Sequence, residues 1–528
     1  MSLHKKLNLD VNPYIFFISI GAILTFLFFG AVFPEGTGEV FDLVQSFIVN
    51  QFGWFYILGV AIFLIFVVYL FFSRFGKIKL GPDDSEPDYS YASWFTMLFS
   101  AGMGIGLVFF SVAEPMFHYL APPTMEGESM AAAREAMRLT FFHWGFHPWA
   151  IYIIVGMSLA YFHFRKGLPL SIRSAFYPIL GDKIYTWRGN VIDILAIFGT
   201  MFGVATSLGL GVMQVNAGLE YLFGVDVSTT VQILLIAGIT AAATISVVLG
   251  LDKGIRRLSN FNMTIAVGLI IFVFILGPTA YLLSATVENT GYYLQNLIQS
   301  TFYLGTFADN GVDGWLAGWT LFYWGWWIAW SPFVGMFIAR ISRGRSIQEF
   351  VGGVLLVPTA FTFIWLTVFG NTGLSLEIFN DAGISGLDTE QMLFAMLDSL
   401  PLATITSIAA TLVIITFFVT SSDSGSLVID MLASGGNPNP PVGQRVFWAV
   451  SEGAVAAVLL LAGGLGALQT ASITTGLPFT IVLLLMCYSL YKGLSMEGTE
   501  RLVRRKTFKA KSKKPQESLD VDSGSPDA

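Results

Sequence analysis

Aromatic side chains crowd into one short segment of this chain, between Trp315 and Arg345. Six of the thirteen tryptophans lie there, at positions 315, 319, 324, 326, 327 and 330. Helical spacing places Trp326 and Trp330 on one face, with Trp327 and Phe333 beside it. Aromatic rings attract cations that cannot donate hydrogen bonds, such as quaternary ammonium groups, each for roughly 0.5–2 kcal/mol. The segment therefore indicates either a cage for such a cation or a bulky helix at a protein or lipid interface.

A glycine-rich stretch from Ser100 to Gly106 reads SAGMGIG and is followed by Glu114-Pro115. Glycine inside a helix costs roughly 1 kcal/mol relative to alanine, so the stretch predicts a locally unwound helix. Inside a membrane, irregular backbone is tolerated only around a cavity or a bound group. The stretch therefore favours an ion or substrate site; the alternative is close helix packing through small residues.

Hydroxyl groups and a carboxylate cluster between Thr416 and Ser424, in the run TFFVTSSDS. Polar groups in a membrane-spanning segment indicate an ion path, and oxygen ligands suit a hard cation such as Na⁺. The alternative is that the hydroxyls bond to their own helix and that Asp423 is neutral or paired.

The run from Phe141 to Tyr152 reads FFHWGFHPWAIY and combines aromatic and histidine side chains. His143 and His147 lie one turn apart, which is a spacing found in metal sites. No third ligand follows on that face, so we expect buried, hydrogen-bonding histidines instead of a metal centre. Trp144, Trp149 and Tyr152 supply further aromatic faces.

The elements that must position these residues are membrane-spanning helices. The chain has 528 residues, of which 54% are hydrophobic and 12% charged, with a mean hydropathy of +0.68. This composition predicts an all-α polytopic membrane protein. Two runs exceed the length that a bilayer needs and carry Gly or Ser clusters, which predicts tilted or broken helices at 91–119 and 400–434. The twelve apolar runs lie near 13–33, 52–73, 91–119, 139–163, 190–222, 230–250, 259–285, 315–340, 346–371, 400–434, 444–465 and 472–492.

Basic residues predict the orientation. All lysines and arginines except Arg134 and Arg138 fall at the termini or in the loops on one side, whereas the opposite loops are acidic. The positive-inside rule then places both termini in the cytoplasm and the protein in the inner (plasma) membrane. The basic tail from Arg501 to Lys514 is either a stop-transfer anchor or a sensor that lies on anionic lipid. No nucleophile–base set, phosphate loop or dinucleotide fingerprint is present in the sequence, so neither an enzyme nor a nucleic-acid partner is expected.

Three motifs, GMGIGLVFFSVAEP (102–115), FFHWGFHPWAIY (141–152) and FYWGWWIAWSPFVGMFIARISRGRSI (322–347), resemble the betaine/carnitine/choline transporter family. The resemblance covers about 13–495. It implies twelve transmembrane helices with two inverted five-helix repeats, a neurotransmitter:sodium symporter-like fold and a homotrimer. The implied segments are a cytoplasmic N-terminus 1–12, two peripheral helices in 13–90, repeats 91–285 and 315–495, an outer amphipathic helix 286–314 and a cytoplasmic tail 496–528.

The same resemblance implies the site residues. An aromatic box maps to Trp144, Trp149, Tyr152 and Trp327, and a central substrate position to Trp326 and Trp330, with Phe322 and Trp324 nearby. Backbone at Met103, Gly104 and Ile105 would meet a substrate carboxylate. The implied sodium ligands are Ser100, Met103, Phe417, Thr420 and Ser421. A second sodium position would use Thr200 and Phe333, but its other hydroxyl is replaced by Val204, which puts that position in doubt.

Gly106 refines the expected substrate. Proton-coupled choline transporters of the family have a similar motif but carry an acidic residue at the position of Gly106. Glycine favours a substrate that brings its own carboxylate, with Na⁺ as the coupling ion and no other cofactor. We therefore expect a sodium-driven importer of a zwitterionic quaternary-ammonium compatible solute, foremost glycine betaine. The alternatives are a carrier of dimethylsulfoniopropionate, carnitine, choline or ectoine, proton-coupled or an exchanger, and, in another class, a channel or osmosensor.

Overall fold

The computed structural model describes residues 9–102, 104–248, 252–307 and 313–512, with backbone alone at 99, 101–102, 252–257, 313 and 498–512. The regular secondary structure of this part of the chain is helical, apart from one isolated β-bridge between Lys79 and Ser346. The α-helices are α2 (Pro13–Val32), α3 (Pro34–Phe72), α4 (Tyr91–Gly102), α5 (Ile105–Leu120), α6 (Met130–Trp144), α7 (Phe146–Ala160), α8 (Tyr177–Leu180), α9 (Trp187–Phe223), α10 (Thr229–Val248), α11 (Asp252–Leu276), α12 (Thr279–Thr301), α13 (Asp313–Leu316), α14 (Phe322–Ile341), α15 (Ile347–Leu366), α16 (Thr372–Asn380), α17 (Met392–Asp398), α18 (Ala403–Ala433) and α19 (Val442–Ser512).

Shorter turns join these helices. The 3₁₀ turns are Arg74–Lys77, Ile172–Phe176, Gly181–Tyr185 and Ile384–Gly386, and the π turns are Tyr161–Arg165, Ala317–Leu321 and Thr367–Asn371. Among the described residues, nine helices are long and apolar enough to cross a membrane, and α5 is a shorter apolar helix. Each of the twelve apolar runs coincides with a helix, a helix pair or half of α19, which confirms the all-α prediction.

The predicted weak point in the third run is a real interruption. Helix α4 ends at Gly102 and α5 begins at Ile105, with Gly104 extended between them (φ −160°, ψ 173°). A second interruption divides α19, where Gly463 (φ 166°) and Gly464 (φ 57°) leave helical geometry. Only glycine adopts the backbone of Gly464 without strain, so this position turns one long helix into two spans.

Of the two alternatives for the run 400–434, a tilted or a broken helix, the structure excludes the break, because α18 is one continuous helix of 31 residues. Two other predicted details are wrong. The second run is part of a 39-residue helix, α3, that follows α2 after Phe33 alone. The seventh run ends at Leu276, since Gly277-Pro278 stops the helix, so the outer helix α12 starts at Thr279 and not near 286. Proline lacks the N–H that would continue the helix.

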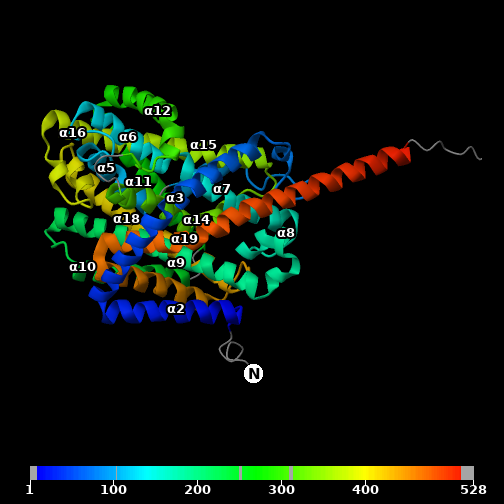
Figure 1. Cartoon of the computed structure of the whole chain (residues 1–528). Helices are drawn as coiled ribbons and strands as arrows, with labels where there is room; N and C mark the ends of the chain where they lie inside the picture. The colour runs from blue at the N-terminus through cyan, green and yellow to red at the C-terminus, as the bar shows by residue number, and fades with distance from the viewer. Residues whose placement is uncertain (1–8, 103, 249–251, 308–312, 513–528) are drawn as a thin grey trace, which may run out of the picture.

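The basic loops meet on one side of the bundle. Leu80 N–H donates to Arg345 O (2.8 Å), Arg165 Nη2 lies 2.7 Å from Asp83 Oδ1, and Asn12 N–H donates to Ala433 O (2.8 Å). In Figure 1, α8 and the C-terminal part of α19 lie at the right of the bundle, α10 and α16 lie at the left, and α12 crosses the top. The charge asymmetry of the loops is therefore an asymmetry of the folded molecule.

Candidate functional site

A cavity lies where α5 meets α7, α14 and α18, directly behind the break between α4 and α5. Its volume is about 30 Å³, which holds little more than water. A trimethylammonium group is larger, so the lining must spread to admit one. Its lining residues are Gly104, Ile105, Gly106, Leu107, Trp144, Pro148, Trp149, Tyr152, Ser207, Trp326, Trp327, Trp330, Thr362 and Ser421.

The aromatic lining is a set of rings in contact. Trp326 and Trp327 stack at 4.7 Å between centroids (14°), and Trp144 stands edge-on to Trp327 at 4.9 Å (71°). Tyr152 lies 6.4 Å from Trp327 and 6.5 Å from Trp330, again edge-on. Rings at several angles around one space present more than one face or edge to its contents, which is the arrangement that a cation–π cage needs.

Two polar atoms in this lining have no hydrogen-bond partner among the described residues. They are the indole N–H of Trp330 and the hydroxyl of Tyr152, both buried. A buried donor without a partner costs about 1–3 kcal/mol. A ligand that carried an acceptor, such as a carboxylate, would relieve that cost in both places.

Gly106 allows the close approach of one ring. A Cβ atom at this position would lie 2.2 Å from the Cη2 atom of Trp326. Trp326 cannot easily move aside, because it is stacked between Phe322 (5.4 Å) and Trp327 and donates to Gly203 O (3.3 Å). Packing thus explains this glycine, in addition to the absence of charge that the sequence suggests.

The structure brings most of the sequence-predicted substrate residues to this cavity, but not all of them. Phe322 supports Trp326 from behind, and Trp324 stacks on His147 (5.2 Å) away from the cavity. Phe333 lies against Trp330 at 5.4 Å. Met103 lies outside the described residues. The role of each residue in binding stays a prediction.

Ser207 and Thr362 line the cavity and were missed from the sequence. Ser207 donates to Gly203 O (3.3 Å), and Thr362 donates to Trp144 O (3.1 Å). Single Ser and Thr residues in apolar helices commonly bond to the backbone of their own helix. Nothing in the sequence around Ser207 and Thr362 therefore marked them as site residues.

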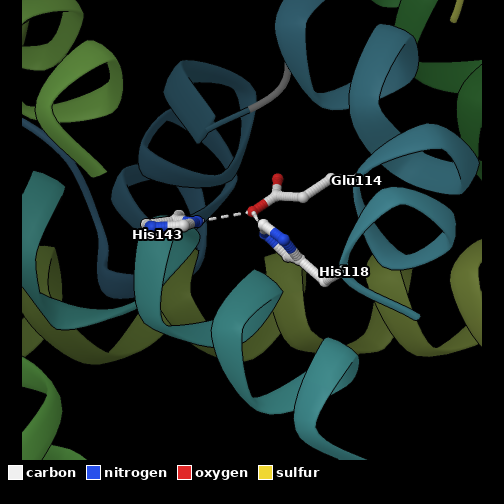
Figure 2. A group of neighbouring side chains, drawn as sticks. All are labelled: Glu114, His118 and His143. Atoms are coloured by element: carbon white, nitrogen blue, oxygen red, sulfur yellow. Dashed lines mark hydrogen bonds and ion pairs between the residues drawn. The ribbon is translucent and has the colours of Figure 1, made fainter. Parts of the chain in front are cut away.

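Behind Trp144 lies a buried carboxylate, Glu114, which joins three helices. Oε2 accepts from Trp144 Nε1 (2.7 Å) and from the Tyr323 hydroxyl, and Oε1 contacts His143 Nδ1 (2.6 Å) and His118 Nε2 (3.3 Å). Figure 2 shows Oε1 of Glu114 between the two imidazole rings, one from α5 and one from α6. All five side chains are buried.

The network assigns the protons on both rings. Trp315 Nε1–H donates to His118 Nδ1 (3.3 Å), so the proton of His118 lies on Nε2 and points at Glu114. His143 likewise presents Nδ1–H to Glu114 while its Nε2 pairs with the Thr320 hydroxyl (3.0 Å). Glu114, His118 and His143 have the composition of a metal site, yet the nitrogens that face the carboxylate are donors. The cluster is therefore better described as a hydrogen-bonded anion that fixes the orientation of Trp144.

Glu114→Gln tests this description. The glutamine amide keeps the shape of the side chain but replaces one accepting oxygen by an NH₂ donor. In either orientation this NH₂ group would face donors, either the two imidazoles or the Trp144 and Tyr323 side chains. We expect a loss of stability of about 1–3 kcal/mol and weaker substrate binding, because Trp144 loses its anchor. Thermal unfolding and tryptophan-fluorescence titration measure the two effects. The exposed Glu288→Gln on α12 is the control, and an unfolding temperature of Glu114→Gln equal to that of the wild type contradicts this role.

Of the sequence-predicted sodium ligands, Phe417, Thr420 and Ser421 lie on α18, which contacts α5, and Ser100 lies on α4. Ser421 lines the cavity. The Thr420 hydroxyl donates to Thr416 O (3.0 Å) and Phe417 O (3.2 Å), so it is bonded to its own helix. Thr200 does the same with Ala196 O (2.8 Å). These hydroxyl oxygens keep lone pairs for a cation.

The sequence matches a known protein family over most of its length. Residues 14–499 match the sequence model of the BCCT, betaine/carnitine/choline family transporters. The match covers nearly the whole chain, so this protein belongs to that family and is a multi-pass membrane transporter.

Three curated relatives illustrate the similarity. The chain is 50% identical over 496 residues to a glycine betaine transporter of Acinetobacter baylyi, covering 93% of this chain and 74% of that one. It is 47% identical to the glycine betaine transporter OpuD of Bacillus subtilis (92% and 95% covered). It is 45% identical to a glycine betaine/proline/choline transporter of Vibrio parahaemolyticus (93% and 91% covered).

Proposed function

We propose that this protein imports a zwitterionic quaternary-ammonium compatible solute, foremost glycine betaine, together with Na⁺. The observation that carries the proposal is the composition of the cavity. Its rings suit a trimethylammonium group, its two unpartnered donors on Trp330 and Tyr152 suit a carboxylate, and none of its described lining residues is charged. A neutral cavity with both features matches a zwitterion better than a net cation.

Relatives support the same substrate class. Two of the three relatives above are named as glycine betaine transporters, and the third is named for proline and choline as well. Sodium coupling is supported by Ser421, which lines the cavity and follows Thr420 in α18. A cation bound there would lie beside the substrate, so each ligand would favour the binding of the other.

The remaining features of the proposal follow the family. They are two inverted five-helix repeats, a homotrimer, a plasma-membrane location with both termini in the cytoplasm, and a C-terminal tail that contacts anionic lipid. The basic loops that meet on one side of the bundle support the placing of both termini in the cytoplasm. Residues 513–528 of the tail lie outside the described residues.

Competition binding tests the substrate class. Glycine betaine, dimethylsulfoniopropionate, carnitine, choline and ectoine are titrated against the purified protein by tryptophan fluorescence in Na⁺ buffer. We expect the zwitterions to bind more tightly than choline, which has no carboxylate for the two donors. Tighter binding of choline than of glycine betaine contradicts the zwitterion assignment and replaces it with a cation carrier.

Removing two hydroxyls tests the ion site. In Thr420→Ala/Ser421→Ala, two oxygen ligands are lost, so the Na⁺ concentration for half-maximal uptake is expected to rise by about tenfold or more. Betaine affinity at low Na⁺ should fall as well, because coupling between two ligands is reciprocal. Thr416→Ala, an exposed hydroxyl on the same helix, is the control. Unchanged Na⁺ dependence of the double variant shows that these oxygens are not ligands.

A further inference from the structure

Helix α4 is packed against the rest of the protein along one side only. It ends at Gly102, and the extended backbone of Gly104 separates it from α5. Of its side chains that the structure describes, only Trp94 and Leu98, one turn apart, are buried, whereas most of α5 is buried. An element with few buried side chains opens at a lower free energy than the core around it. Helix α4 is therefore a separate half-helix that can move without disrupting the packing of α5.

The main partners of α4 are α15 and α14, which meet at the loop 342–346, called here the α14–α15 corner. The Trp94 ring lies close to Gly353 of α15, where a Cβ atom on the glycine would lie 2.4 Å from the indole. Trp94 Nε1–H donates to the Ser342 hydroxyl (3.0 Å). Trp94 thus fixes α4 against both the corner and the first turns of α15.

Arg345 of the corner holds the start of α4 through its guanidinium group. Cζ lies 4.1 Å from the centre of the Tyr91 ring and 4.7 Å from that of the Trp94 ring. Nη2 also donates to Tyr89 O (2.6 Å). Arg345 is only 3% exposed, and a guanidinium group is attracted to aromatic faces more strongly where water is excluded. One side chain of the corner therefore contacts three residues at the start of α4.

Glu349 holds the same tyrosine from the other end of its side chain. Its Oε1 accepts from the Tyr91 hydroxyl. Its Oε2 accepts from the Ser346 N–H (2.8 Å) and the Ser346 hydroxyl (2.9 Å), which form the capping box at the start of α15. Because the capping box fixes the carboxylate, Glu349 cannot follow Tyr91 if α4 moves.

We propose that Arg345, Tyr91 and Glu349 form a clamp that keeps α4 against the α14–α15 corner, and that opening this clamp connects the substrate cavity with the cytoplasm. The inference rests on the proposed function, which places these basic loops in the cytoplasm. The cavity is smaller than a trimethylammonium group, so its lining must move in each transport cycle. Gly104 and Ile105 of that lining follow α4 in the chain. None of the three clamp side chains lines the cavity, so they are positioning residues that set how often the cavity opens inward.

The two halves of the clamp differ in a way that suits reversible opening. Tyr91 is half-exposed, so water can replace both of its contacts when α4 moves away. The corner is fixed by backbone contacts instead: Leu80 N–H donates to Arg345 O (2.8 Å), and Lys79 forms a β-bridge with Ser346. The corner can therefore stay in place while α4 leaves it.

Side-specific labelling tests the clamp, because it measures access to the cavity without transport. In a Cys487→Ser background, which removes the single cysteine, Ser207→Cys places one thiol in the cavity lining. A membrane-impermeant maleimide is applied to the full-length chain in vesicles of either orientation. We expect Tyr91→Leu to raise the labelling rate from the cytoplasmic side by about fivefold or more, and not from the outer side.

Two further clamp variants separate the contributions. Tyr91→Phe keeps the ring for Arg345 but loses the bond to Glu349, so its labelling rate should lie between those of the parent and Tyr91→Leu. Arg345→Gln removes the guanidinium from both rings and should label from the cytoplasmic side at least as fast as Tyr91→Leu.

Matched controls lie in the same loops. Tyr89→Leu removes an exposed tyrosine whose backbone oxygen alone accepts from Arg345. Arg343→Gln removes an arginine of the corner that pairs with Asp88 at 3.7 Å and is half-exposed. Both should label at the rate of the parent, and thermal unfolding checks that each variant is folded.

The outcomes are distinct. An unchanged cytoplasmic labelling rate in Tyr91→Leu, or in a folded Arg345→Gln, overturns the proposal. Faster labelling from both sides, or from the outer side alone, also overturns it, because it shows loosened packing or an opening in the other direction. If Arg345→Gln does not fold, Tyr91→Leu decides alone. Wild-type uptake that ignores Na⁺ would contradict the proposed sodium symport, while the labelling rates would still decide the clamp.

Discussion

Replacing Trp330 with leucine is expected to weaken glycine betaine binding by about tenfold or more, or about 1.4 kcal/mol. The substitution keeps bulk and apolarity but removes both the π face toward Tyr152 and the unpartnered indole N–H. Leucine is favourable in a membrane span, so insertion and folding should survive. Isothermal titration with glycine betaine measures the change.

Trp330→Phe separates the two contributions of this side chain. Phenylalanine keeps a ring but has no N–H, so its loss relative to the wild type reports the donor, and the further loss in Trp330→Leu reports the π face. Trp187→Leu, an exposed tryptophan at the start of α9, is the control for tryptophan removal. Equal affinity of Trp330→Leu and the wild type would remove Trp330 from the cage.

Gly106→Asp is expected to reverse the preference between glycine betaine and choline. Its side chain would enter the space against Trp326, beside the other rings of the cavity. A fixed carboxylate there repels the carboxylate of a zwitterion and attracts the cation of choline. We expect the ratio of betaine to choline affinity to fall by about tenfold or more, with a pH dependence that arises as the new carboxyl group titrates.

Gly106→Ala isolates the steric part of this change. Forcing a methyl group against a packed ring costs about 1–3 kcal/mol of folding stability, and displacement of the Trp326 ring should weaken the binding of both substrates. The ratio between them should stay close to that of the wild type. A ratio that shifts as much in Gly106→Ala as in Gly106→Asp would show that ring displacement, and not charge, sets the selectivity.

The helices and their break were predictable because their signals are local. An apolar run long enough to span a bilayer can be recognised from its own sequence, without knowledge of the helices that pack against it. The alternate glycines between Ser100 and Gly106 disfavour a helix wherever they lie. The limits of α3 were missed, because its first half from Pro34 is polar enough to read as a loop and is helical in the folded chain. The continuity of α18 was left open, because the small and hydroxyl residues within its run are typical of either a tilted or a broken helix.

The site residues likewise comprise some that one segment of the sequence predicts and others that depend on how the helices pack. Trp326, Trp327 and Trp330 are neighbours in sequence, so helical geometry alone placed them together. Motif resemblance added Trp144, Trp149 and Tyr152, which composition could not have linked to them. Apart from His118, which lies one turn further along α5, the partners of Glu114 come from other helices, for example His143 and Tyr323. No periodicity within one segment reveals such contacts, because they depend on how the helices pack.

Uptake of labelled glycine betaine into proteoliposomes, with Na⁺ and H⁺ gradients imposed separately, tests the central claim most directly. The proposed mechanism predicts accumulation when Na⁺ is high outside, at equal pH on both sides. It predicts no accumulation above equilibrium in Na⁺-free K⁺ buffer with a proton gradient alone. Accumulation that proceeds equally well without Na⁺ would contradict sodium symport.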